Sequence, residues 1–375
     1  MTTTFTNLRL CHRGQLLENR NLVISNSTGL IVDPAQATES FHFTHFTDKD
    51  SYASKIDKVA QYLPSTGVTA FYATIPTVHS DDFKKILPSL APRDINGSAS
   101  LLGAHAEGPY LHPSKKGAHN ASLFHLPSQK NPASVYGPAA EDNSTLKLVT
   151  LAPELDGTEN LVFHLSYRGI RTSLGHSSAT YDQGLAALKA GANCLTHTLN
   201  AMAPLHHRDP GLAGLITAGR ETLVDAPSPY FSIIPDGNHL HPAVATMLFR
   251  SNPEKCLIIT DSIEMAGLPD GTYPGHAQIP LNQTKKGSRV VIEGTSTLIG
   301  GCAGLHECVS NLMKWSGCGI AEAVRCATEN VAAFMGDEVR GKLETGRRGD
   351  FVCLSPAGDV IKTFIGGKEV WCRRP

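Results

Sequence analysis

Short apolar runs recur along the middle of the chain, and each is followed by a polar loop and a stretch with helical spacing of its apolar residues. Alternating strands and helices are typical of βαβ units and a parallel sheet. We predict strands at Val68–Ile75, Ser100–Ala106, Leu146–Ala152, Ile170–Gly175, Asn193–Thr198, Phe231–Pro235 and Cys256–Thr260. We predict helices at Ser51–Leu63, Ser80–Leu90, Thr180–Ala190, His241–Arg250 and Leu305–Trp315. The pattern indicates an α/β fold of the (β/α)8-barrel type in which the first strand is degenerate or missing.

The two ends of the chain have a different pattern, with strand-like runs broken by turn residues. The runs are Phe5–Leu10, Gln15–Leu17, Asn21–Ser25 and Gly29–Val32 at one end, and Asp350–Ser355, Val360–Ile365 and Gly366–Trp371 at the other. Neither end alone offers enough strands to bury a face, so we predict one small β-sandwich built from both. Residues 1–40 and 346–375 would form this sandwich, and residues 41–345 the barrel.

Composition narrows the class of protein. With 41% hydrophobic residues and a formal net charge of −1, the 375 residues can bury a large core and lack the basic excess of a nucleic-acid binder. The chain has neither a signal-peptide pattern at its start nor the ~18 apolar residues that span a bilayer. Its nine cysteines include no Cys-x-x-Cys pair. We therefore expect reduced thiols, a cytoplasmic location and no nucleic-acid or membrane partner.

Polar residues gather at the predicted strand ends. Five of the seven runs are followed by histidines or carboxylates, namely His105 with Glu107, His176, His197, Asp236 with His239, and Asp261. A single histidine at a strand end is more often structural than a ligand. Active sites of (β/α) barrels, however, lie at this end of the strands, so five together point to a site. His105 lies on the same strand face as Glu107 and could support it, while Ser177 and Ser178 are expected to cap the next helix.

The residue types suit hydrolysis at a metal. Glu107, His176 and His197 supply the three ligands of a catalytic site that keeps one position open. A bound divalent ion lowers the pKa of its water to ~7 and polarises a carbonyl. Asp261 is the best candidate for the proton-transferring carboxylate. A helix N-cap before Ser262–Glu264 explains Asp261 equally well from spacing alone.

Several segments in the same order between residues 65 and 350 resemble the N-acetylglucosamine-6-phosphate deacetylases of the amidohydrolase superfamily. The matching segments are Gly103–Leu111 with Lys115–Asn120, Leu174–Thr180, Thr196–Met202, Arg208–Gly214, Ile234–His239, Ile259–Asp261 and Thr297–Gly301. The resemblance implies deacetylation of N-acetyl-D-glucosamine 6-phosphate by a homodimer with one divalent ion (Zn, Fe, Co or Mn) per subunit.

The resemblance also implies roles for single residues. Glu107, His176 and His197 would hold the metal, Asp261 would be general base and then acid, and His119 would stabilise the oxyanion. Arg208 and His239 would bind the 6-phosphate, although His241 fits the position of His239 equally well. The substrate-binding residues implied in this way are Ala118, His119, Asn200, Ala201, Arg208, His239, Leu298, Ile299 and Gly300.

One part of the family pattern is missing. The family opens its barrel with a strand bearing Pro-Gly-Phe-Ile-Asp and then His-x-His or a substitute, whereas Val32–Phe46 stands there in this chain. His42 and His45 are three residues apart, so on a strand they face opposite sides. We predict that Ser40–Phe46 serves as a makeshift strand. Two alternatives stay open, namely a catalytically impaired family member and another amidohydrolase such as a deaminase.

Overall fold

The structure is a computed structural model of the chain. It describes residues 43–44, 46–219, 221–223, 226–275 and 281–373, and the backbone of residues 2–12, 15–25 and 31–32. In this part of the chain no helix has the length and apolar composition needed to cross a membrane.

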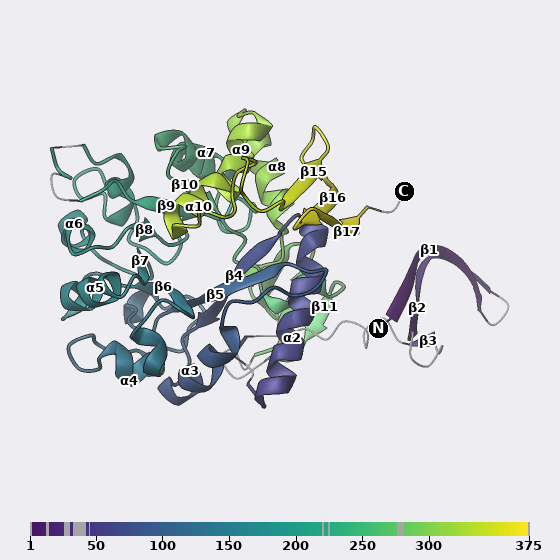
Figure 1. Cartoon of the computed structure of the whole chain (residues 1–375), viewed down its shortest axis with the longest axis horizontal. Coiled ribbons are helices and arrows are strands. Elements are labelled where there is room, and N and C mark those ends of the chain that lie inside the picture. The colour runs from purple at the N-terminus through teal and green to yellow at the C-terminus, as the bar shows by residue number, and fades with distance from the viewer. Residues whose placement is uncertain are drawn as a thin grey trace.

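A parallel sheet of seven strands forms the centre of the molecule (Figure 1), and its strands neighbour one another in chain order from β4 to β10. The strands are β4 (Ala70–Pro76), β5 (Ser100–Glu107), β6 (Leu146–Leu151), β7 (Arg171–Leu174), β8 (Cys194–Leu195), β9 (Tyr230–Ile233) and β10 (Cys256–Ile258). All six pairings are parallel. The seven predicted barrel strands are therefore confirmed, because apolar runs between polar loops are what a doubly covered parallel sheet requires.

Helices surround the curved sheet (Figure 1). They are α2 (Lys49–Tyr62), α3 (Ser80–Ile86), α4 (Pro132–Tyr136), α5 (Thr158–Tyr167), α6 (Tyr181–Lys189), α7 (Pro242–Ser251), α8 (Leu305–Ser316), α9 (Ile320–Ala327) and α10 (Glu329–Met335). The 3₁₀ turns are η1 (Leu63–Thr66), η2 (Leu87–Leu90), η3 (Pro113–Lys115), η4 (Ala121–Leu123), η5 (Gly137–Ala140), η6 (Leu212–Thr217) and η7 (Glu264–Gly267). All five predicted helices are present. The start of α6 is fixed by a capping box in which Thr180 and Gln183 satisfy each other's backbone amides.

In the described residues the sheet ends at β4 and β10. The predicted makeshift strand falls partly outside the described residues, since Ser40–His42 and His45 are not among them. Of the rest, Phe43 and Thr44 lie in a turn and Phe46 is not in a strand. The Tyr52 hydroxyl donates to the Phe43 carbonyl at 2.6 Å, and the Phe46 ring lies 5.4 Å from the Tyr52 ring. These residues therefore attach to α2 rather than extend the sheet.

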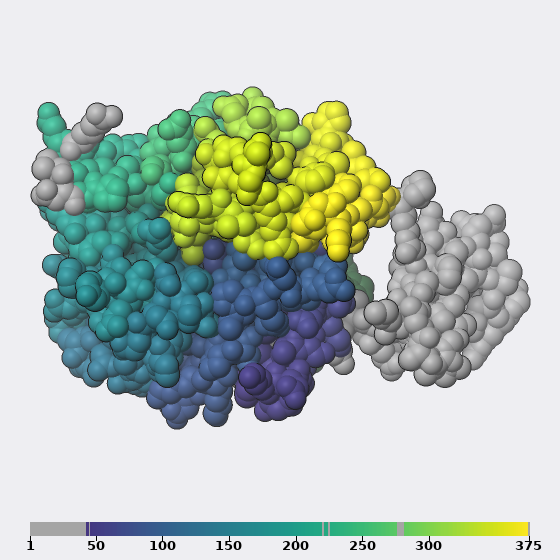
Figure 2. Space-filling view, in the orientation of Figure 1, coloured from purple at the N-terminus to yellow at the C-terminus, as the bar shows by residue number. Residues whose placement is uncertain are grey.

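The ends of the chain form separate antiparallel sheets. One contains β1 (Thr2–His12), β2 (Gln15–Ser25) and β3 (Ile31–Val32), so the two runs predicted between residues 15 and 25 are one strand. The other contains β15 (Phe351–Leu354), β16 (Val360–Ile365) and β17 (Lys368–Cys372). The latter packs on the segment before β4 (Figure 2), where the Thr363 hydroxyl donates to the Pro64 carbonyl at 2.7 Å. A joint sandwich of both ends stays a prediction.

A fourth sheet was not predicted. It is antiparallel and contains β11 (Gly271–Tyr273), β12 (Gln283–Lys286), β13 (Arg289–Ile292) and β14 (Leu298–Gly301). The predicted substrate-binding residues Leu298, Ile299 and Gly300 therefore lie on a strand. The end of β14 lies beside the residues after β10, because Ser262 and Gly301 form a parallel bridge and the Ile263 amide donates to the Gly301 carbonyl at 3.0 Å.

Candidate metal centre and active site

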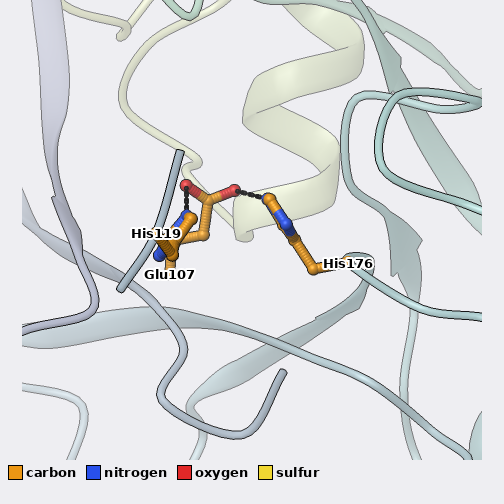
Figure 3. A group of neighbouring side chains, drawn as sticks. All are labelled: Glu107, His119 and His176. Carbon is orange, nitrogen blue, oxygen red and sulfur yellow. Dashed lines mark ion pairs between the residues drawn. The ribbon is translucent and has the colours of Figure 1, made fainter. Parts of the chain in front are cut away.

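The three predicted metal ligands converge at the carboxyl ends of β5, β7 and β8. Glu107 is the last residue of β5, and His176 and His197 each follow the ends of β7 and β8 by two residues. The parallel register sets Glu107 opposite Pro76 of β4 and Thr150 of β6. All three side chains are buried. Figure 3 shows the Glu107 carboxylate between the rings of His119 and His176.

The donor atoms of these ligands form a nearly equilateral triangle. The Oε1 atom of Glu107 lies 3.2 Å from His176 Nε2 and 3.1 Å from His197 Nε2, and the two Nε2 atoms are 3.1 Å apart. Metal–ligand distances of ~2.0–2.1 Å with tetrahedral angles require donor separations of about 3.3 Å. The triangle therefore fits one divalent ion above its centre.

The ring of His176 is in the tautomer that a ligand needs. Its Nδ1 donates to the Lys115 carbonyl at 2.8 Å, so the neutral ring keeps a lone pair on Nε2, which faces Glu107 and His197. Metal-binding histidines commonly use their second nitrogen in this way. For His197 the Nδ1 atom is buried without a hydrogen-bond partner among the described residues.

The electrostatics of this cluster favour the charged form of the Glu107 carboxylate beside the histidine rings. Burial opposes ionisation of Glu107, but the three imidazole rings beside it, His176 foremost, outweigh burial and hold the pKa of Glu107 well below its ordinary value. Burial lowers the pKa of His176 despite its proximity to Glu107. Burial has the same effect on His197, yet its hydrogen bond to Glu107 and the charge of that carboxylate raise the pKa overall.

His119 completes the cluster from the loop after β5. Its Nε2 lies 3.3 Å from the Glu107 Oε2 atom, on the side away from His176. Its Nδ1 accepts a hydrogen bond from the Thr77 backbone amide at 3.2 Å. Glu107, His119 and His176 together also form a group whose ligand atoms all lie within 4.8 Å of one another. Distance alone thus leaves His119 available either as a ligand or as a hydrogen-bond donor.

Backbone strain is concentrated at the same strand ends. The non-glycine residues with positive φ in the described chain are His176 (47°), His197 (31°), Leu199 (73°), Ala201 (49°) and Asp261 (46°). Such conformations cost about 1–3 kcal/mol each and persist where the surroundings enforce them. Two predicted ligands, the predicted base, the predicted sugar contact Ala201 and its neighbour Leu199 share this feature, so backbone strain coincides with the predicted site.

Asp261 follows β10, and its side chain is 42% exposed. Its Oδ2 atom lies 3.9 Å from His239 Nε2. Asp236 orients the His239 ring by accepting from its Nδ1 at 2.8 Å. Burial alone would raise the pKa of Asp236, but the hydrogen bond and the charge of His239 outweigh burial and lower it. A Cβ atom on Gly301 would lie 2.6 Å from Asp236 Oδ2, so the approach of β14 requires glycine there.

These positions bear on two questions that spacing left open. The N-cap of η7 is Ile263, and no helix begins at Asp261, so the capping explanation of Asp261 is not supported. His239 lies beside Asp261, whereas His241 is exposed and accepts from the Ala243 amide at the start of α7.

Two loops that carry predicted substrate-binding residues are interlocked. The Lys115 ammonium donates to the Met202 carbonyl at 2.8 Å, and the Ser177 amide donates to the Ala201 carbonyl at 3.0 Å. Ala118 is exposed, and Asn200 and Ala201 are half-buried, as expected for residues that face a ligand. Leu298 and Ile299 are half-buried and Gly300 is buried on β14.

Arg208 is exposed and lines a surface pocket. The other lining residues are Thr180, Tyr181, Asp182, Asp209 and Pro210. Asp209 holds this loop against α6 by accepting from the Tyr181 amide at 3.0 Å. Arg208 thus has an exposed surface to meet an anion, and the structure does not bring it together with the metal ligands.

Two residues that support the site, Glu154 and Thr77, were not predicted, and the capping role predicted for Ser177 and Ser178 is wrong. Glu154 follows β6, and its two carboxylate oxygens accept from the Ser177 hydroxyl at 2.7 Å and the Ser178 amide at 2.6 Å. The two serines therefore do not cap α6, whose N-cap is Thr180. Glu154 and Thr77 stand at the ends of the remaining two strands, so counting every polar residue there would have found them.

The expected support of Glu107 by His105 is also not seen. The His105 ring instead bridges the hydroxyls of Thr74 at 3.1 Å and Thr150 at 2.8 Å. The Thr150 hydroxyl is in turn hydrogen-bonded to the Thr196 hydroxyl at 2.8 Å. Burial lowers the pKa of His105 to about 4, so the ring is neutral and links strands rather than ligands.

A curved parallel α/β sheet with a carboxylate and two imidazoles at its strand ends defines the amidohydrolase class. No family model matches the chain. The chain is 33% identical over 377 residues to N-acetylglucosamine-6-phosphate deacetylase of Caenorhabditis elegans, covering 96% of this chain and 89% of the relative. It is 34% identical over 328 residues to N-acetylgalactosamine-6-phosphate deacetylase of Escherichia coli O157:H7, covering 85% of this chain and 82% of the relative.

A solved structure is similar over nearly the whole length. The Mycobacterium smegmatis N-acetyl-D-glucosamine-6-phosphate deacetylase, crystallised as a variant with N-acetyl-D-glucosamine-6-phosphate, gives a TM-score of 0.73 at 26% identity, covering 99% of both chains. The chain belongs to the N-acetylglucosamine-6-phosphate deacetylase family.

Proposed function

We propose that this chain hydrolyses the acetamide of N-acetyl-D-glucosamine 6-phosphate, giving D-glucosamine 6-phosphate and acetate. The observation that carries the proposal is the triangle of donor atoms from Glu107, His176 and His197, which lie 3.1–3.2 Å apart. Asp261 follows β10, two strands beyond the β8 strand that precedes His197. The named relatives and the substrate in the M. smegmatis structure support the choice of substrate.

Glu107, His176 and His197 would hold one divalent ion, which when bound supplies Lewis acidity for the acetyl carbonyl and a water of lowered pKa. Their chemistry suits Zn, Fe, Co or Mn without distinguishing them. Asp261 would take a proton from the attacking water and pass it to the amide nitrogen as the C–N bond breaks. His119 would face the carbonyl oxygen, where negative charge develops.

The sugar phosphate would lie across the interlocked loops. Ala118, Asn200 and Ala201 would contact the sugar, Leu298, Ile299 and Gly300 would border it from β14, and Arg208 with His239 would bind the phosphate. A guanidinium suits a phosphate dianion because its planar fork can donate two parallel hydrogen bonds. We also propose a homodimer and a cytoplasmic location. The eight described cysteines are all free, which supports a reducing compartment.

Acetate release, measured with metal content on the same sample, tests the proposal. We expect release from N-acetylglucosamine 6-phosphate and much less from unphosphorylated N-acetylglucosamine. Arg208→Ala should raise KM for the phosphorylated sugar about 10–100-fold, since a charge-assisted pair contributes ~1.5–3 kcal/mol, and leave KM for the unphosphorylated sugar unchanged. The control is Lys189→Ala, which removes an exposed cation from the end of α6 and should change neither KM.

Other outcomes would separate the alternatives. A metal-loaded sample without acetate release would indicate an impaired family member. Faster release from N-acetylgalactosamine 6-phosphate, the substrate in the name of the E. coli relative, would move the assignment to the epimer.

A further inference from the structure

Thr77 lies immediately after β4, one residue beyond the pairing of Pro76 with Glu107. Because of this register, Thr77 lies at the end of an edge strand and next to Glu107 and His119. The Thr77 hydroxyl donates to the Glu107 carbonyl at 3.0 Å, and the Thr77 amide points at His119. Both Thr77 and His119 are buried.

The bond between Thr77 and His119 has a fixed direction. A backbone N–H can only donate, so a proton on His119 Nδ1 would face the amide proton, and the bond requires Nδ1 to accept. The Thr77 hydroxyl oxygen also lies 3.1 Å from Nδ1, but its own proton goes to the Glu107 carbonyl, so it does not replace the amide as the donor to the ring. The neutral ring then holds its proton on Nε2, which points at Glu107 Oε2 across 3.3 Å. His176 is arranged in the opposite sense, because a carbonyl can only accept and its Nδ1 must therefore donate to Lys115.

We infer that the Thr77 backbone amide is a positioning group that fixes His119 as an Nε2–H donor and thereby keeps it out of the metal's ligand set. A nitrogen that carries a proton cannot ligate a metal. The backbone partner of each ring beside Glu107 therefore decides whether its Nε2 atom can bind the metal. His176 offers a lone pair, and His119 offers a hydrogen-bond donor for the carbonyl oxygen of the substrate. This assignment rests on the proposed deacetylase function for its catalytic consequence.

The tautomer itself is tested without turnover. With ¹⁵N-labelled histidine in the zinc-loaded protein, we expect the His119 signals to show a proton bonded to Nε2 and none on Nδ1. His119→Gln identifies these signals by their loss. A proton on Nδ1, or an Nε2 shifted by metal coordination, would overturn the inference whether or not the protein releases acetate.

Paired variants test the consequence. Gln places an amide NH₂ near the Nε2 position of histidine, whereas Asn places it near Nδ1. His119→Gln should therefore retain at least tenfold more kcat than His119→Asn, with similar KM and metal content. Equal loss in both variants would contradict the assignment.

At the positioning residue itself, Thr77→Val keeps the amide and removes the hydroxyl, while Thr77→Pro removes the amide. We expect Thr77→Val to lower kcat less than tenfold and to leave the Nε2–H tautomer in place. Thr77→Pro, if folded, should lose about 10²–10³-fold in kcat, as for removal of an oxyanion donor. A change of tautomer in Thr77→Val would assign the positioning role to the hydroxyl and refute the role of the amide.

Discussion

The middle of the parallel sheet and its edge contribute to the site in different ways. At the ends of β5, β7 and β8 the side chains of Glu107, His176 and His197 are only 5–10% exposed, and each strand has neighbours on both sides. Asp261 follows β10, the last strand in the described order, and its side chain is 42% exposed. On the proposed function, Glu107, His176 and His197 of the central strands would form the cage for an ion, while the edge would provide an accessible carboxylate.

If the proposed roles hold, this difference makes metal binding and proton transfer separable in this chain. The cage depends on interactions among residues of adjacent strands, such as the hydrogen-bonded chain from His105 through Thr150 to Thr196. The segment of Asp261 is held instead by β9, which pairs with β10, and by the end of β14, through the bridge of Ser262 to Gly301. Damage to one region should leave the other intact.

The largest effect is expected in the cage. His176→Ala removes one of three ligands, so we expect bound metal to fall from one ion per subunit to none, and acetate release to fall to background. Chelation of the unaltered protein should have the same effect and also lower its Tm, because a ligand at about 100 times its Kd stabilises by ~2.7 kcal/mol. Elemental analysis and thermal scans measure both quantities.

The matched control is His206→Ala, which removes an exposed histidine from a nearby loop. It should retain metal and activity. Full metal occupancy in His176→Ala would show that the cage is not where the ion binds.

The next largest effect is expected at the edge. Asp261→Asn keeps the shape of the side chain but removes its proton-accepting charge, so kcat should fall by ~10²–10⁴ while metal content and Tm stay near those of the unaltered protein. Measuring kcat together with metal content on one preparation checks the separation. Loss of the ion in this variant would make Asp261 part of the cage and remove the contrast between the two regions.

A smaller effect is expected where a loop supports the cage. Glu154→Gln weakens the two bonds that hold Ser177 and Ser178 beside the strained His176. Replacement of groups that orient metal ligands commonly costs about 10–100-fold in metal affinity, and we expect a loss in that range. Competition with a chelating dye measures it, and Glu159→Gln on the exposed side of α5 is the control. An unchanged affinity would mean that the sheet alone positions His176.

Sequence patterns predicted the middle of the sheet well, since apolar runs bounded by polar loops are sufficient to locate buried parallel strands. They were weaker where strands are polar. β12 has the sequence Gln-Thr-Lys-Lys and shows no apolar face, so the sheet from β11 to β14 left no signal. The ligands could be anticipated from strand-end positions. The tautomer of His119 could not, because it depends on the direction of one backbone amide.

The smallest effect is expected from completing the sheet. In the described residues β4 and β10 are its edges, and edge strands present N–H and C=O groups without ladder partners. A closed barrel has no such edges. Replacing Val32–Phe46 with the corresponding first-strand segment of the C. elegans relative should therefore stabilise the fold. Each buried unpaired group costs ~1–3 kcal/mol, and ~1 kcal/mol shifts Tm by about 2–4 °C in a protein of moderate size, so we expect a rise of several degrees. Because Asp261 follows the edge strand β10, kcat should rise as well, with metal affinity unchanged.

A graft of equal length with a polar, glycine-rich sequence controls for the loss of Phe43 and Phe46, whose rings pack against the core. If the unaltered chain already unfolds above ~65 °C, beyond the usual range for mesophilic domains, the open edge does not limit its stability.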